Sequence, residues 1–145
     1  MPISREMMNG RVALRWQFRA IALASLGWNT FGALAYTMGA IREPGYVQSL
    51  GPVIIDYLDT MPGWAMAAWG AGTAAALLGS LFLLLRSRFA VGAFGAAVAA
   101  LAIATLHSFT QGCVVAPDNI WLAIAVGGLV LLGVSVMMRR AGLLR

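Results

Sequence analysis

The stretch "AIALASLGWNTFGALAYTMGAI", Ala20–Ile41, holds no charged residue over a length that can cross a lipid bilayer. A helix rises about 1.5 Å per residue, so roughly 20 apolar residues cover the ~30 Å of hydrocarbon. Three further runs, 60–85, 89–117 and 119–138, are equally free of charge. The 145-residue chain is 61% hydrophobic and 10% charged, whereas soluble domains carry about 25% charged residues. We therefore predict four transmembrane helices.

We expect an all-α integral membrane protein that forms one domain, residues 1–145. Its spans are predicted at about 14–39, 63–85, 89–110 and 119–138. Only Arg86–Arg88 separates the second charge-free run from the third. A connection this short places the two helices side by side and antiparallel. The expected architecture is an antiparallel bundle of four transmembrane helices.

The basic residues predict the orientation of the chain. All ten are arginines, and all except Arg42 lie before the first span, between the second and third, or after the fourth. The opposite side holds four of the five acids: Glu43, Asp56, Asp59 and Asp118. By the positive-inside rule, both termini are cytoplasmic. The net charge of +5 is then an orientation signal, and we expect the arginine collar to meet anionic lipid headgroups rather than nucleic acid.

The outer loop between the first two spans contains "GPVIIDYLDTMP", Gly51–Pro62. Proline is favoured in the first turn of a helix and stops a helix at its far end, so this segment is predicted to be a short helix. One face would carry Ile54, Tyr57, Leu58 and Met61, and the other Asp56, Asp59 and Thr60. We expect this helix to lie in the membrane interface with its apolar face towards lipid.

Small residues recur at helical spacing along the second and third spans. The second span has Ala68, Gly72 and Ala76, and the third has Gly92, Ala96, Ala100 and Ala104. In lipid, such residues allow two helix backbones to approach closely. The pattern predicts tight packing within this chain, with packing against other chains as the alternative.

Asn29 places an amide side chain within the first span, about 15 Å deeper in the bilayer than Arg19. Thr73 occupies the middle of the second span and is the predicted side-chain partner of Asn29. An interhelical hydrogen bond of this kind fixes the register of two helices. Alternatively, Asn29, Thr73 and Tyr36, together with His107, line a path for a solute.

The chain offers little reactive chemistry. It has one histidine, His107, and one cysteine, Cys113, which is either free or paired with another chain. No ionisable group lies in the middle of a span, where proton and ion pathways usually carry one. We therefore expect no enzyme activity and no resident cofactor. A weaker alternative is that His107 binds the metal of a haem or chlorophyll-type pigment.

Two segments, "LASLGWNTFGALAYTM" (23–38) and "LLGSLFLLLRSRFAVGAF" (77–94), carry a resemblance to known proteins. They include an aromatic-Asn-x-x-Gly pattern at Trp28, Asn29 and Gly32. The chain resembles a group of small four-helix bacterial inner-membrane proteins of unknown function, often labelled "sugar transporter" by automatic annotation. The resemblance implies a multi-pass protein of the bacterial inner (plasma) membrane. Members commonly carry an acid where this chain has Ala35, so no role of that acid is expected here.

Two functions remain open at this stage. The first is a non-enzymatic accessory or stabilising subunit of a larger membrane complex, for example a respiratory or photosynthetic assembly, with other membrane-protein chains as partners. The second is a transporter or channel for a small neutral, sugar-like solute that acts as a homo-oligomer. Pigment binding through His107 is a third and weaker alternative.

Overall fold

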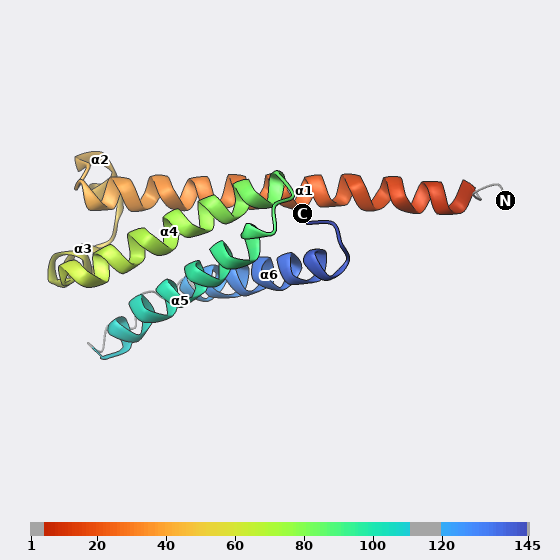
Figure 1. Cartoon of the computed structure of the whole chain (residues 1–145). Helices are drawn as coiled ribbons and strands as arrows, with labels where there is room; N and C mark the ends of the chain where they lie inside the picture. The colour runs from red at the N-terminus through yellow and green to blue at the C-terminus, as the bar shows by residue number, and fades with distance from the viewer. Residues whose placement is uncertain (1–4, 111–119, 145) are drawn as a thin grey trace.

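The computed structural model describes residues 5–110 and 120–144, which are helical with short connections and contain no strand. The helices are α1 (Arg5–Ala40), α2 (Pro44–Ser49), α3 (Pro52–Thr60), α4 (Gly63–Leu84), α5 (Phe89–Thr110) and α6 (Ile120–Arg140) (Figure 1). α4 and α5 match the predicted helices closely, whereas α1 begins well before the predicted start at about residue 14. The all-helical class predicted from the sequence is confirmed.

Three helices are long and apolar enough to cross a membrane: α4, α5 over Phe89–Leu106, and α6 over Ala123–Arg140. The chain is therefore built as a multi-pass membrane protein. α1 is long enough but clearly less hydrophobic than these three. The four arginines and Glu6 in its first half lower its mean hydropathy most, and the polar residues around Asn29 lower it further.

The long helices run antiparallel in chain order, and each packs on the next (Figure 1). α4 lies between α1 and α5, and α6 packs on α5. The N-terminal part of α1 projects beyond the ends of the other helices (Figure 1). Since α1 packs mainly on α4 and α6 mainly on α5, the edge between α1 and α6 is the loosest of the arrangement.

The turn between α4 and α5 closes with an arginine in the left-handed conformation, Arg86 at φ 57°. Ser87 N donates to Phe82 O at 2.7 Å and Arg86 N to Leu83 O at 3.0 Å, the Schellman pattern in which glycine is usual. The arginine side chain has its own role, because its guanidinium carbon lies 5.3 Å from the ring centroid of Phe18 on α1. The turn is thereby tied to α1.

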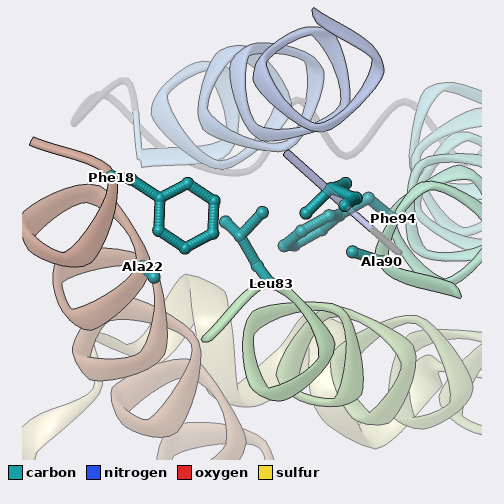
Figure 2. Packing of buried hydrophobic residues seen from close by; sticks show 6 residues of the cluster. Phe18, Ala22, Leu83, Ala90 and Phe94 are labelled. Atoms are coloured by element: carbon teal, nitrogen blue, oxygen red, sulfur yellow. The ribbon is translucent and has the colours of Figure 1, made fainter. Parts of the chain in front are cut away.

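An apolar cluster holds the helices together at the end near this turn. It comprises Phe18, Ala22, Leu83, Ala90, Phe94 and Leu144. Figure 2 shows Phe18 and Ala22 of α1 on one side of Leu83, with Ala90 and Phe94 of α5 on the other. Leu144 reaches this cluster because the chain turns back after α6 (Figure 1). The cluster thus joins α1, α4, α5 and the C-terminal tail.

The connection between α1 and α4 contains α3 at the predicted residues, and also the unpredicted α2, which the Glu43 side chain caps. The two faces of α3 divide as expected: Tyr57 and Leu58 are only 4% exposed, whereas Asp56 and Asp59 are exposed. At Tyr57 and Leu58 the apolar face is therefore covered by the protein itself, and the expectation that these residues face lipid is wrong. The predicted position of α3 in the membrane interface stays a prediction.

Arg42, the one arginine between α1 and α4, fastens α3 to the end of α1. Its Nη2 donates to Leu58 O at 2.7 Å and lies 2.8 Å from Asp59 Oδ1. Because both charged side chains are well exposed, the ion pair adds about 1 kcal/mol or less. Its main effect is to fix the position of α3.

Candidate functional site

A polar cluster joins α1 to α4 where Ser25, Asn29 and Ser80 meet. Ser25 Oγ lies 2.7 Å from Ser80 Oγ, and Asn29 Nδ2 donates to Ser80 Oγ at 2.9 Å. Ser25 is 4% exposed and Ser80 is fully buried. Ser25 and Asn29 share one face of α1 because they are four residues apart. The cluster therefore cross-links two helices inside a largely apolar protein.

The direction of each hydrogen bond follows from its acceptor. Ser80 Oγ donates to the Ala76 carbonyl at 3.0 Å, so it accepts from both Ser25 Oγ and Asn29 Nδ2. The second Nδ2 hydrogen of Asn29 goes to the Ser25 carbonyl at 3.0 Å. Both amide donors are thus used. Asn29 Oδ1 accepts no hydrogen bond from the described part of the chain.

The predicted pairing of Asn29 with Thr73 is wrong. Thr73 Oγ1 donates to Trp69 O of its own helix at 2.9 Å, and the partner of Asn29 lies about two turns further along α4. The prediction assumed that the midpoints of the two helices lie at one level. The Ser25–Ser80 contact instead pairs α1 with the C-terminal part of α4.

A cavity of about 170 Å³ lies beside this cluster, between all four long helices. α1 contributes Trp28, Asn29, Phe31, Gly32 and Ala35, and α4 contributes Trp69, Gly72, Thr73 and Ala76. α5 contributes Phe94, Ala97, Val98 and Leu101, and α6 contributes Ile124, Gly128 and Leu131. Two predicted site residues, Asn29 and Thr73, therefore line one cavity although they do not bond to each other.

Tyr36, the third predicted residue, packs beside the cavity and is not among its lining residues. Its ring meets the lining residue Trp69 edge to face, with 5.1 Å between the ring centroids. Its hydroxyl donates to Met66 O at 3.4 Å. Gly70 leaves room for the ring, since a Cβ atom there would overlap Tyr36. Tyr36 thus fixes one wall of the cavity.

The remaining predicted residues fall where no side chain is described. The backbone of His107 belongs to α5, but the predicted metal ligation by its side chain lies outside the described residues. Cys113 lies between the two described segments, 5–110 and 120–144. Pigment binding through His107 stays a prediction.

Sequence reasoning missed Ser25, Ser80 and the aromatic walls of the cavity. Ser25 had a usable signal, because a polar residue four positions before Asn29 lies on the same helix face. Ser80 follows Gly79 directly, at a place where α4 approaches its neighbours closely.

We expect Ser80→Ala to lower the free energy of unfolding by about 1 kcal/mol, since interhelical hydrogen bonds in membrane proteins average about 0.6 and reach about 1.7 kcal/mol. The matched control is Ser135→Ala, because Ser135 is also fully buried but donates only to Leu131 O of its own helix. The measurement is reversible unfolding in detergent micelles, followed by tryptophan fluorescence. Equal losses in the two variants would show that the α1–α4 bonds add nothing specific.

The cavity is lined by one amide, one hydroxyl group and otherwise apolar or aromatic residues. Within residues 5–110 and 120–144, no three His, Cys, Asp or Glu side chains gather as metal ligands would. In the comparisons with known proteins, no family model, no curated protein and no solved structure matches this chain.

Proposed function

We propose that the protein is a non-enzymatic subunit that stabilises a larger complex in the bacterial inner membrane by helix packing. The outer face of α5 carries this proposal. Gly92, Ala96 and Ala99 are exposed there, and a Cβ atom added at Gly92 would meet nothing within 4 Å. Helices pack closely through small residues, and lipid does not require such residues. An exposed small-residue face therefore favours contact with another apolar helix.

The contrast with α6 strengthens this proposal. The exposed residues of α6 are mostly large and aliphatic: Val126, Leu129, Val130 and Met137. These side chains suit contact with lipid chains, whereas the small residues of α5 form a flat strip between the exposed Phe89 and Ile103. A partner helix gains close van der Waals contact on this strip.

In this proposal α1 is the fourth span, with Ala20–Ile41 inside the bilayer and both termini cytoplasmic. The position of the arginines on one side supports this orientation. Arg88 and Arg139, with Phe89 and Gly92, border a surface cavity of about 330 Å³ at the same end, which suits an anionic lipid headgroup. Accessibility in whole cells of single cysteines placed at the two ends of a chain that carries Cys113→Ser tests the orientation. Labelling from outside would contradict it.

Native membranes solubilised in mild detergent provide the test of the subunit role. On a native gel with mass-spectrometric identification, we expect the wild-type chain to migrate within a larger defined complex. Ala96→Leu adds bulk to the α5 face and is expected to remove most of the chain from that complex. Val130→Leu adds bulk to an exposed position of α6 and is the matched control, expected to migrate like the wild type.

Two results would contradict the subunit role. One is a wild-type chain that migrates alone at about its own mass of 15.3 kDa. The other is an Ala96→Leu variant that stays in the complex as fully as Val130→Leu.

The transporter alternative has support in Asn29 and Thr73, which line the same cavity. The other lining residues are apolar or aromatic, which fits a sugar-like solute poorly because its many hydroxyls would lack partners. Proteoliposome uptake that is lost in Asn29→Ala would favour this alternative over the subunit role. The absorption spectrum of the purified protein tests the pigment alternative: with no band beyond that of the aromatic residues, His107 holds no pigment.

A further inference from the structure

We propose that the cavity between α1, α4, α5 and α6 binds a small lipid-soluble molecule that carries one ring and one hydroxyl group, a phenol-sized alcohol. The proposal is independent of the subunit role. It rests on the size of the cavity, on its apolar walls and on the hydrogen-bonding capacity left at its polar edge.

The volume of the cavity fits a single ring. An engineered cavity of about 150 Å³ lined by Leu, Ile and Phe stays dry and binds benzene, and the present cavity measures about 170 Å³. Its walls include Trp69 and Phe94, which are held in place from outside. Trp69 has the Tyr36 ring against it, and Phe94 is 1% exposed with Gly79 beside it. Walls fixed in this way form a site before any ligand arrives.

The hydrogen-bond inventory decides which polar group the ligand must carry. Asn29 has both of its amide hydrogens committed, to Ser25 O and Ser80 Oγ. Its orientation is fixed because the Ser25 carbonyl accepts only, so Nδ2 must face it. Thr73 has also committed its only hydrogen, to Trp69 O. The oxygens of Asn29 and Thr73 are therefore acceptors, and a ligand must donate to them.

Asn29 Oδ1 is a hydrogen-bond acceptor that is not fully buried. Among the described side chains, no fully buried nitrogen or oxygen lacks a hydrogen-bond partner. Because Oδ1 accepts no hydrogen bond, it keeps some accessible surface, and since Asn29 lines the cavity we infer that the oxygen faces it. A hydrocarbon chain in the cavity would leave this oxygen unsatisfied, which is unfavourable in an apolar setting. A hydroxyl group satisfies it.

We infer that a ligand enters from the membrane at the edge between α1 and α6. The two helices make no extensive contact with each other, and Trp28 and Phe31 at this edge of α1 are 49% and 68% exposed. The Trp28 indole reaches towards Gly127 of α6, with Nε1 4.0 Å from where a Cβ atom would lie. Its N–H donates to no group of the described chain and can donate to the hydroxyl oxygen of the ligand. An apolar alcohol dissolved in the bilayer can therefore enter sideways.

The test uses two fluorinated probes of nearly equal shape, 4-fluorophenol and 4-fluorotoluene, with the purified full-length chain in detergent micelles. Fluorine NMR shifts are titrated with protein, and empty micelles supply the background of partitioning. We expect saturable binding of 4-fluorophenol and at least tenfold weaker binding of 4-fluorotoluene. A tenfold ratio corresponds to about 1.4 kcal/mol, a normal value for one hydrogen bond.

Two variants distinguish the effect of the hydrogen bond to the ligand hydroxyl from the effect of the volume of the cavity. Asn29→Leu removes the acceptor at similar volume and is expected to bring the two probes to equal affinity. Ala35→Phe fills the cavity without touching the polar cluster and is expected to abolish binding of both. Thermal unfolding establishes that each variant is folded, and Ala35→Phe keeps the test open if Asn29→Leu does not fold.

Either of two outcomes overturns the proposal. Equal binding of both probes to the wild type would make the cavity a hydrocarbon site, filled by a lipid chain in the membrane. Binding of 4-fluorophenol that Ala35→Phe leaves unchanged would place the probe elsewhere on the protein or in the micelle.

Discussion

Gly79→Val is expected to destabilise the protein by about 2 kcal/mol, within the ~1–3 kcal/mol typical of overpacked cores. A Cβ atom at Gly79 would lie 3.0 Å from Cδ1 and Cε1 of the Phe94 ring, closer than normal contact. The ring is 1% exposed and belongs to the apolar cluster with Leu83 and Ala90, so the only space beside it is the cavity that it lines. Either the ring leaves its packed position towards that cavity or α4 and α5 separate, and both cost packing contacts. The measurement is unfolding of the purified chain in detergent micelles.

Gly92→Val is the matched control for this prediction. It makes the same change within a helix, with the same effect on helix propensity, but a Cβ atom at Gly92 meets nothing within 4 Å. We expect its stability to equal or slightly exceed that of the wild type. Equal stability of the two variants would mean that the α4–α5 contact yields without penalty, against the close packing described above.

The small-residue pattern was read correctly as a packing signal, but its geometry was incomplete. Positions four apart on a helix advance by about 40° around its axis at each step. The row on α5 therefore moves from one face to another: Gly92 and Ala96 are exposed, Ala100 is half-buried and Ala104 is 5% exposed. Its second half packs within the chain, as Ala100 does against Gly72. Its first half remains open to a partner.

The wrongly predicted hydrogen bond between Asn29 and Thr73 shows why the depth of a residue in one helix does not identify its partner in another. Counting from Arg19 places Asn29 at a given depth in α1, but nothing in the sequence states how far α4 is shifted along α1. That shift follows from the contacts of Phe18, Ser25 and Leu83 as a set. Once Ser25 meets Ser80, Thr73 is out of reach of Asn29.

Other features depend on several elements at once and could not be read from any one segment. The cavity exists only because four helices meet at particular distances. The left-handed arginines at positions 42 and 86 occupy sites where glycine is expected. Each is explained by a contact of its side chain with a distant element. α2 also depends on such detail, because the Glu43 side chain that caps it belongs to the loop after α1.

Leu83→Ala is expected to lower the free energy of unfolding by about 2 kcal/mol, below the ~2.7–5.0 kcal/mol range measured for buried leucines in a soluble protein. Leu83 is fully buried between Phe18 and Phe94, so truncation leaves a void that these rings cannot close. The lower value is expected because a membrane helix that separates from its neighbours stays in lipid or detergent. Transfer of apolar surface to water therefore contributes nothing to the loss of stability, and only the lost packing contacts contribute to it.

The matched control for this prediction is Leu85→Ala, the same truncation at a residue that is 74% exposed two positions further along the chain. We expect this variant to unfold within about 0.5 kcal/mol of the wild type, as surface substitutions usually do. Both are measured by unfolding in the same micelles.

Leu83→Ala also removes a member of the cluster that contains Leu144, so the C-terminal tail should become easier to cleave with carboxypeptidase. Equal cleavage of the tail in both variants would show that Leu83 does not hold the tail. Equal stabilities would show that the apolar cluster does not hold α1, α4 and α5 together.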